Sequence, residues 1–407
     1  MHPLRSASLF AATFLAPLAF ASEKLTVTVT HDLAIARPAE TIVVPFEEVR
    51  QAFGADTPMH HVLVRDAAGN PVPAQVTNFR PNLRPGVYDE LLFQHDFAAG
   101  EKSVTFTIER TEAPVPPTAS KVFARYVPER HDDFAWENDR IAHRIYGPEL
   151  NTAAAGKSQL RTSGLDVWAK RVRYPIVDRW YSKGHDAYHV DTGEGLDLYS
   201  VGPGRGAGGT GVWDGSTLHT SDNWASVKVL ANGPIRAVFE VSYAPWSAGE
   251  GVTVAETKRF TVDAGHNLDR IESTFQVQGA EEVTVALGIV NPPDATAEGG
   301  LQDAAAAVLS LWQTYEKHGS LGVGVVLEPG AACAGFAEGA SADDRRNKKP
   351  LSNRLMLVKV KDGDTVAYRA GAGWTRSGDF ADRAAWEQYL LALSQRLASP
   401  VQITVSK

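Results

Sequence analysis

The sequence contains a single cysteine, Cys333, among its 407 residues. One thiol cannot form a disulfide bond within the chain, so the stability of the fold has to come from a hydrophobic core. Hydrophobic residues make up 43% of the sequence, which is enough to build such a core. Cys333 lies in a run of small residues without base-like neighbours. We therefore expect it to be a small buried side chain and not a reactive thiol.

The sequence also lacks an excess of basic residues. It has 40 Lys and Arg residues against 48 Asp and Glu residues, a net charge of −8 at pH 7. Proteins that bind nucleic acid or anionic membranes need a basic face, so this balance argues against both kinds of partner. An anionic sugar is still compatible with an acidic chain, because the local field in a cleft decides whether it binds.

Long apolar runs are missing, and the one apolar stretch of note lies at the N-terminus. Residues 1–21 contain a short basic region, an apolar stretch from Leu9 to Phe20 and the motif Ala19-Phe20-Ala21. This pattern is typical of a signal peptide that is cut before Ser22, and the stretch is too short to span a bilayer. We therefore expect the protein to be exported, to the periplasm or out of the cell, without insertion into a membrane.

No internal repeat at a fixed period is present, which argues against solenoids and propellers. Instead, Leu25, Val27 and Val29 alternate with threonines, and many similar segments follow between turn residues. This pattern predicts an all-β protein with antiparallel sheets. Helical spacing is convincing only in Asp382–Leu397, where Asp379 or Asp382 could cap a helix that packs on the outside of a sheet.

The proline-rich segment 113–120 interrupts the strand pattern and predicts a linker. Residues 22–112 would then form a small N-terminal β-sandwich, and residues 121–407 a large antiparallel domain. Within the latter, strand periodicity fades between about Gly147 and Asp222, and such long irregular stretches are usually functional. Seven ionisable or phenolic residues fall within thirteen positions here: His185, Asp186, Tyr188, His189, Asp191, Glu194 and Asp197.

Two sets of segments resemble known families. One set resembles the strand succession of the supersandwich fold and comprises Asn232–Phe239, Glu256–Val262 and His266–Ile271. That fold is found in galactose-mutarotase-like proteins and several polysaccharide lyases. The other set resembles a bacterial family, domain of unknown function 4861, and comprises Trp136–Gly147, Tyr188–Asp197 and Gly371–Asp379. The second resemblance implies an exported protein of glycan degradation, often for uronic-acid-containing glycans, but it supplies no established reaction. The first implies a supersandwich-like domain over residues 121–407.

In that context, a β-elimination on a uronic acid is the leading hypothesis, which makes the protein a polysaccharide or oligosaccharide lyase. The reaction needs a base near neutral pKa, an acid for the leaving oxygen and a cation for the substrate carboxylate. His189 suits the base and Tyr188 the acid, and Lys170, Arg171 or Arg173 could hold the carboxylate.

His143 lies on a predicted strand with Ile141 and Ile145, so it is either a core histidine or a site residue. Sugar rings stack on aromatic faces, and we expect about two of the five aromatic residues Trp168, Trp180, Tyr181, Trp213 and Trp224 to face a cleft. The further candidates for substrate binding are Tyr199, Trp374 and Asn138.

Other functions stay open. A glycoside hydrolase would use two carboxylates, for which Asp191 and Glu194 are candidates. His185, His189 and Asp191 are acceptable ligands for zinc, and Asp186, Asp191 and Glu194 for calcium. Nearby glycines disfavour the helix that would bring both histidines to one face. A non-catalytic glycan-binding module or a mutarotase-like enzyme is also compatible with the pattern. A nucleotide is not expected, because no Walker motif or helix follows the glycine run 204–209.

Overall fold

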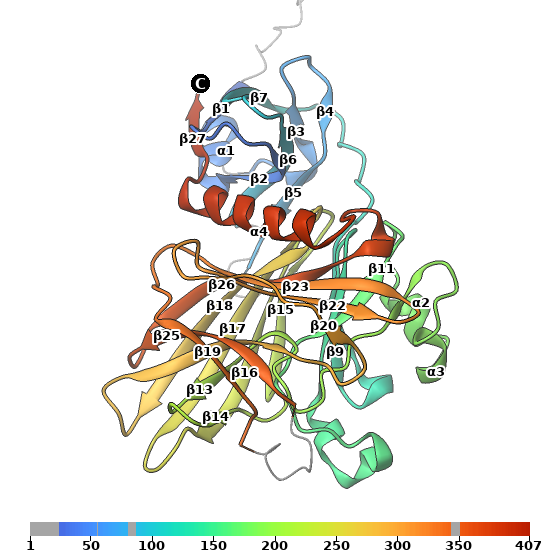
Figure 1. Cartoon of the computed structure of the whole chain (residues 1–407). Helices are drawn as coiled ribbons and strands as arrows, with labels where there is room; N and C mark the ends of the chain where they lie inside the picture. The colour runs from blue at the N-terminus through green and yellow to red at the C-terminus, as the bar shows by residue number, and fades with distance from the viewer. Residues whose placement is uncertain (1–23, 55, 80–86, 343–350) are drawn as a thin grey trace, which may run out of the picture.

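The computed structural model describes residues 24–54, 56–79, 87–342 and 351–407. In these ranges the chain folds mainly into antiparallel β-strands, with one long helix near the C-terminus, which confirms the all-β prediction. The expected signal peptide, residues 1–21, lies outside the described residues. Figure 1 shows a smaller part built from the N-terminal strands, a larger part built from the rest, and the long helix between them.

The smaller part packs a five-stranded sheet against a three-stranded sheet. The predicted alternation is present, since Leu25, Val27 and Val29 are buried and contribute to a core that includes Phe93 and Phe106. Its elements are β1 (Lys24–Thr30), β2 (Arg37–Pro45), α1 (Phe46–Phe53), the 3-10 turn η1 (Met59–His61), β3 (Val62–Arg65), β4 (Pro71–Val72), β5 (Ala74–Thr77), β6 (Glu90–Phe97) and β7 (Ser103–Arg110).

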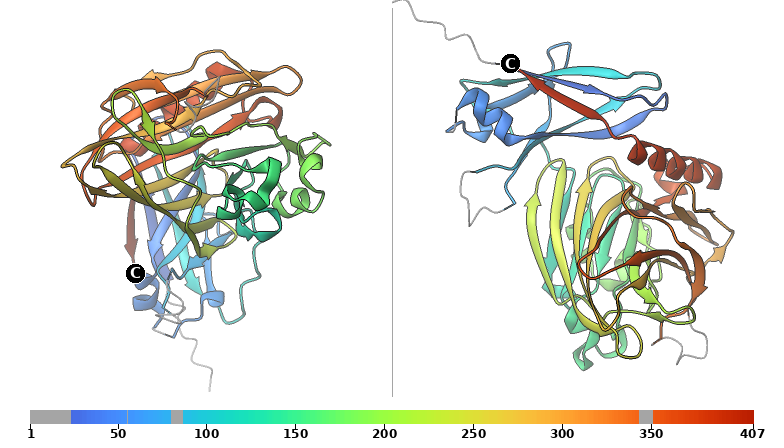
Figure 2. Two further views of the ribbon diagram at one scale, coloured as in Figure 1. Left: turned by 90° about the horizontal axis from the view of Figure 1, so that it is seen from below. Right: turned by 90° about the vertical axis from the view of Figure 1, so that its left-hand side faces the viewer.

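The C-terminal strand β27 (Gln402–Ser406) returns to the smaller part, where it pairs with β1 and places Val405 opposite Val27. The right-hand view of Figure 2 shows this strand running from the long helix into the N-terminal sheet. The range 121–407, expected to form the large domain, therefore ends in a strand that belongs to the N-terminal sandwich by its hydrogen bonds. This pairing covers the edge of β1 that would otherwise expose unpaired backbone groups.

The larger part contains three sheets. The nine-stranded sheet consists of β15 (Ser226–Asn232), β16 (Arg236–Ser247), β17 (Thr253–Asp263), β18 (Leu268–Gln278), β26 (Thr365–Trp374), β23 (Gly319–Leu327), β22 (Val308–Tyr315), β20 (Thr296–Ala297) and β21 (Gln302–Asp303). A second sheet consists of β14 (Leu218–His219), β13 (Ala207–Trp213), β19 (Val283–Val290), β25 (Asn353–Val360) and β24 (Gly335–Gly339). A third consists of β12 (Gly195–Asp197), β11 (Asp166–Lys170), β10 (Ala142–Ile145), β9 (Asp133–Glu137) and β8 (Phe123–Val127).

The main core lies where residues of the nine-stranded sheet meet those of the other two sheets. Phe239 and Phe260 stack with ring centroids 4.8 Å apart, and Trp136 of the third sheet packs against both. Among the described residues of the larger part, the connections between the strands contain these short helices: η2 (Pro128–Arg130), η3 (Pro148–Asn151), η4 (Ala153–Ser158), α2 (Val177–Tyr181), α3 (His185–Tyr188) and η6 (Thr375–Ser377). The short helices α2 and α3 project beside the third sheet (Figure 1). Cys333 is only partly buried, against the expectation of a buried side chain.

The long helix α4 (Arg383–Ala398) begins where the sequence predicted it. Asp382 caps it by accepting a hydrogen bond from the backbone N–H of Ala385. The helix packs on the outer face of the nine-stranded sheet, and a Cβ on Gly322 of β23 would lie 2.5 Å from the ring of Trp386. Glycine therefore allows the large indole to sit directly on the strand. No helix in the described ranges is long and apolar enough to cross a membrane.

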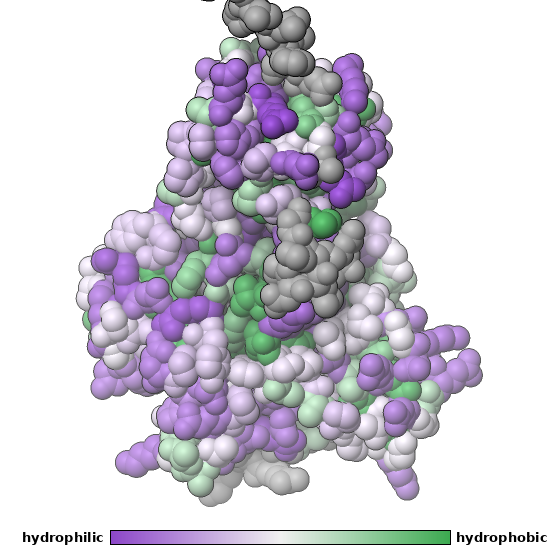
Figure 3. All heavy atoms as spheres, turned by 180° about the vertical axis from the view of Figure 1, so that it is seen from behind, coloured by the Kyte–Doolittle hydropathy of each residue, from purple (hydrophilic) through white to green (hydrophobic). Residues whose placement is uncertain are grey.

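Seen from behind, hydrophilic side chains cover most of the surface, and an apolar area lies near the middle of the face (Figure 3). A pocket of about 870 Å³ lies between the small sandwich, the proline-rich segment and the turn from β15 to β16. Apolar residues such as Val72, Pro116 and Pro234 contribute to its wall.

We predict that Trp386→Ala lowers the free energy of unfolding by about 3–5 kcal/mol, because it removes a fully buried indole from the contact between α4 and the sheet. Chemical denaturation followed by far-ultraviolet circular dichroism measures this change. The matched control is Gln388→Ala on the exposed side of the same helix, which should change stability by less than about 0.5 kcal/mol. Equal losses in both variants would contradict the packing described for α4.

Candidate functional site

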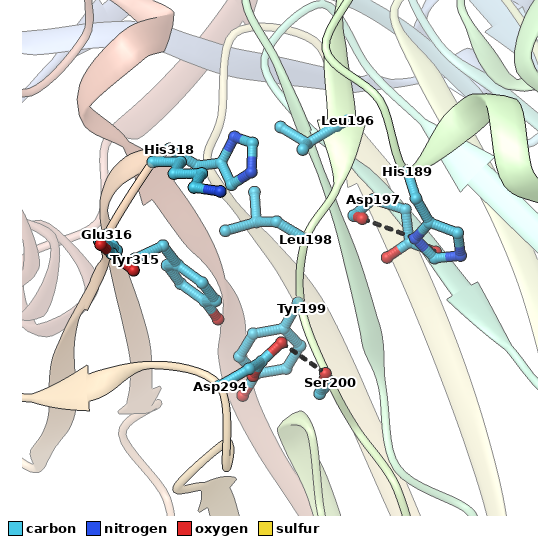
Figure 4. A pocket seen from close by; sticks show the side chains of 11 residues that line it. His189, Leu196, Asp197, Leu198, Tyr199, Ser200, Asp294, Tyr315, Glu316 and His318 are labelled. Atoms are coloured by element: carbon cyan, nitrogen blue, oxygen red, sulfur yellow. Dashed lines mark hydrogen bonds and ion pairs between the residues drawn. The ribbon is translucent and has the colours of Figure 1, made fainter.

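A pocket of about 340 Å³ opens beside the segment that follows β12. The segment 196–200 forms one wall, and the turn from β22 to β23 together with Asp294 forms the other. Figure 4 shows His189 and Asp197 on one side of Leu196 and Leu198, with Tyr315, Glu316 and His318 on the other. A molecule lying over the two leucines would therefore meet polar groups at both sides.

Asp197 belongs to a buried charge network beneath the pocket. The guanidinium of Arg144 on β10 donates to the carboxylate of Asp166 on β11 at 2.5 Å and to that of Asp197 on β12 at 2.9 Å. The hydroxyls of Tyr146 and Tyr181 donate to Asp166 and Asp133 respectively. Adjacent antiparallel strands bring these groups together, because the register places Arg144 opposite Asp166 and Trp168 opposite Asp197.

The network contains more carboxylates than nearby guanidinium charge can neutralise. Burial, reinforced by the charge of Asp166, raises the pKa of Asp197 well above its ordinary value, although Arg144 opposes the shift. Burial also raises the pKa of Asp133 to about 6. A raised pKa makes a carboxyl group keep its proton to higher pH, and Asp197, which also lines the pocket, can therefore serve as an acid.

His189 follows the short helix α3 and reaches the same pocket. Its Nδ1 lies 2.8 Å from the main-chain oxygen of Asp197. A carbonyl oxygen only accepts hydrogen bonds, so Nδ1 carries the proton and Nε2 of the neutral ring is left as a proton acceptor. Burial lowers the pKa of His189 from its ordinary value, which favours the neutral ring, while 41% of the side chain stays exposed. The arrangement fits a general base whose orientation is fixed by Asp197.

The opposite wall supplies further polar groups. Ser200 donates a hydrogen bond of 2.9 Å to the carboxylate of Asp294. Lys317 is exposed at the pocket, and no carboxylate of the described residues pairs with its ammonium group. Lys317 is thus available to a negatively charged ligand.

Comparison with known proteins assigns the chain to a family. The model of the domain of unknown function DUF4861 matches residues 29–403. The chain belongs to the DUF4861 family. A curated relative, Uncharacterized protein P7 from Formosa agariphila, is 30% identical over 391 residues, which cover 94% of each chain. The resemblance seen in the sequence is thereby confirmed over nearly the whole chain.

Solved structures give a weaker likeness. A protein in glycosyl hydrolase family 38 and an alpha-mannosidase, both from Enterococcus faecalis, align with 95% of this chain at a TM-score of 0.49, with 11% and 10% identity. The chain spans about half the length of those proteins, 48% and 46% respectively. The galactosidase domain of the alpha-galactosidase-sucrose kinase AgaSK aligns with 62% of this chain and 41% of that chain, at a TM-score of 0.26 and 12% identity. Likenesses at this level assign neither a fold family nor an activity to this DUF4861 chain.

Tyr188 and His143 are both buried, although the catalytic roles predicted for them require contact with the substrate. Tyr188 is buried and stacks on Trp168, and its hydroxyl accepts a hydrogen bond from Arg144. His143 stacks on Trp136 and is also buried, which favours the alternative of a core histidine. Neither residue lines the pocket.

The cations expected to bind a substrate carboxylate have partners within the chain. Lys170 is buried and donates to Glu137 at 2.6 Å. Arg171 pairs with Asp191 and lies over the ring of Trp374, 5.2 Å from its centroid. Lys170 therefore stabilises the third sheet and is not accessible to a sugar, whereas Arg171 is still about one-third exposed.

Asp191 and Glu194, the carboxylates predicted for hydrolysis, accept hydrogen bonds from groups in and near their own loop. Asp191 accepts from the backbone N–H of Gly193 at 3.0 Å, in addition to its pair with Arg171. Glu194 accepts from four side chains of one short stretch: Tyr174, Arg179, Trp180 and Lys183. Although burial opposes the charge, these donors hold the pKa of Glu194 at about 2. Glu194 is thus an anchor for α2 and lies outside the pocket wall.

The aromatic residues are mostly core residues. Trp168, Trp180, Tyr181 and Trp224 are buried and none of them lines the candidate pocket, against the expectation that about two of the five would face a cleft. Trp213 is half-buried and lines a different pocket, and Trp374 is buried with its Nε1 donating to the main-chain oxygen of His318. Tyr199 is buried but contributes to the wall of the candidate pocket.

Asn138 forms a turn and does not reach the pocket. Its side-chain oxygen accepts from the backbone N–H groups of Arg140 and Ile141, and its amide donates to two carbonyl oxygens near β17. For the candidate metal ligands, the rings of His185 and His189 lie 4.9 Å apart, but Asp191 is engaged by Arg171. The described part of the chain contains no group of three or more residues arranged to hold a metal ion.

Asp294, Tyr315, Lys317 and His318 were missed by sequence reasoning, and Asp197 was named only as one carboxylate among several. The signal for Asp197 was its place at the end of a short strand after the ionisable loop. The hairpin residues carried no signal, because they are more than a hundred positions away from His189 in the sequence.

We predict that Glu194→Gln lowers the free energy of unfolding by about 1–3 kcal/mol at pH 7, because it removes the charge that four donors share. The folded pKa of about 2 lies below the ordinary value of 4.5, so the carboxylate stabilises the fold above about pH 4.5. This contribution is lost as the pH falls toward 2. Denaturation at several pH values should show the difference from the wild type shrinking below pH 4, whereas Asp186→Asn, at a fully exposed carboxylate, should have little effect at any pH.

Proposed function

We propose that this DUF4861 protein is an exported carbohydrate-active enzyme that cleaves a glycosidic bond by acid–base chemistry in the pocket of His189 and Asp197. The observation that carries the proposal is the pairing of a neutral, oriented histidine with a buried carboxyl group of raised pKa. In many enzymes two titratable groups whose environments shift their pKa values apart serve as the catalytic acid and the catalytic base. The pocket volume of about 340 Å³ falls in the range of small-ligand sites.

The reaction that these groups fit best is β-elimination on a uronic acid. Lys317 would neutralise the substrate carboxylate, which makes the neighbouring C5 proton more acidic. Nε2 of His189 would take that proton, the C–H electrons would form the C4–C5 double bond, and the C4–O bond would break. Asp197 would give its proton to the leaving oxygen. Asp197 replaces Tyr188 in this role because Asp197 lines the pocket, whereas Tyr188 is buried and does not.

Hydrolysis is the second candidate, and the presence of Asp294 across the pocket from Asp197 favours it. Asp197, with its raised pKa, would be the acid. Asp294, held by Ser200, would be the second carboxylate that acts on a water or on the sugar. The product distinguishes the two reactions, since only elimination produces an unsaturated sugar.

We predict that His189→Ala lowers turnover of a uronic-acid glycan roughly 10²–10⁴-fold, because it removes the base. The measurement is the rise in ultraviolet absorbance of the unsaturated product while purified protein is incubated with a panel of uronic-acid glycans. His185→Ala is the matched control, because this neighbouring histidine is exposed and does not line the pocket. Unchanged turnover in His189→Ala would remove His189 from the mechanism.

The two reactions make different predictions for Asp294→Asn. If the enzyme is a hydrolase, this variant should lose turnover by about 10²-fold or more, measured as reducing ends without new ultraviolet absorbance. If it is a lyase, turnover should change by less than about tenfold, because elimination needs no second carboxylate. Glycan binding without any product in the wild type would contradict both and indicate a binding protein.

A further inference from the structure

A row of basic side chains extends from the pocket across the neighbouring surface. It is formed by Lys317, Arg376, Arg171, Arg173 and Arg140, which we call the basic strip. Lys317 lines the pocket itself, and Arg376 donates to its main-chain oxygen. The strip therefore begins at the pocket and does not form a separate patch elsewhere on the molecule.

Two carboxylates hold the arginines of the strip in position. Asp191 pairs with Arg171 and lies 3.8 Å from a guanidinium nitrogen of Arg376. Asp379 accepts from both Arg140 and Arg173. Arg173 also donates to the main-chain oxygens of Asp139 and Ser377, which links the end of β11 to the η6 turn. The arginines are thus fixed before any ligand binds, which reduces the entropy lost on binding.

The exposed charge of the strip is mainly positive. Asp191 and Asp379 are each only 11% exposed, while the four arginines keep between 32% and 43% of their side chains exposed. Four arginines pair with these two shielded carboxylates and Lys317 adds a fifth cation, while Asp139 lies beside the strip and the pocket wall holds Asp197, Asp294 and Glu316. This contrasts with the net charge of −8 of the whole chain. A local field of opposite sign beside a pocket attracts and orients anionic ligands.

We propose that the basic strip binds an anionic polysaccharide strand that continues outward from the sugar in the pocket. The inference rests on the proposed function for the sugar in the pocket, and it adds the substrate class: a polymer that carries negative charge on successive residues. Guanidinium groups bind carboxylates and sulfate esters through paired hydrogen bonds, so either kind of anionic group fits the strip. A single sugar would fill the pocket without reaching Arg173 or Arg140.

The test uses the double variant R173Q/R376Q. Asp379 then keeps Arg140, and Asp191 keeps Arg171, so neither carboxylate is left without its ion pair. The matched control is R65Q/R259Q, which removes two arginines of similar exposure that pair with Glu109 and Glu240 far from the pocket. Thermal unfolding of both variants checks that the fold is preserved.

Binding is measured by titration calorimetry with polygalacturonate, alginate, a sulfated carrageenan and neutral dextran, at low and high salt. We expect R173Q/R376Q to weaken binding of an anionic polymer about tenfold or more at low salt and to reduce its salt dependence. The control variant should bind like the wild type, and dextran should not bind. A preference for the carboxylated polymers over carrageenan, or the reverse, identifies the anionic group.

Equal affinity of R173Q/R376Q and wild type for every anionic polymer would overturn the proposal, and so would binding of dextran with the same affinity. These outcomes are independent of turnover. Activity that is lost in His189→Ala but unaffected in R173Q/R376Q would leave the proposed function intact and remove the strip from it. Salt-dependent binding without any product would support the strip while contradicting the enzyme.

Discussion

The guanidinium of Arg144 is the interaction on which the pocket depends. It joins carboxylates from β11 and β12 to β10, in a place where almost no water reaches. A buried charge is tolerated only when its partners are in place, so loss of Arg144 would leave the buried carboxylates of Asp166 and Asp197 without their guanidinium partner. The same contact fixes Asp197, whose main-chain oxygen in turn orients His189. The contacts that hold the strands of the third sheet together therefore also fix the orientation of the candidate base.

The charged segment between β11 and β12 contains two very short helices, and nearby carboxylates hold the first of them in place. The helices α2 and α3 have five and four residues, too few to be stable by themselves. The carboxylates of Glu137 and Glu194 compensate for this by accepting from the first backbone N–H groups and from the side chains of α2. Several residues that look catalytic in the sequence are thus occupied in holding the loop, and the loop in turn presents His189.

The net charge of this protein is negative, whereas the exposed charge of the basic strip is mainly positive. Asp191 and Asp379 are shielded by pairing with arginines of the strip, and these arginines remain partly exposed. A protein with a net negative charge can in this way still present a local positive field at its surface. The C-terminal segment connects the two parts of the molecule, because α4 covers the outer face of the nine-stranded sheet and β27 completes the N-terminal sheet.

The sequence by itself determined the all-β class, the capped helix that begins after Asp382 and the family, because alternation, helical spacing and motifs are local properties of the chain. It also named His189 as the candidate base, and the structure places this residue in the wall of the candidate pocket. Only the tertiary structure decided which ionisable groups are free. Lys170 and Tyr188 are buried by partners from other strands, and Asp294 and Lys317 come from distant turns. Burial and pairing depend on contacts between segments far apart in the chain, and local patterns carry no information about them.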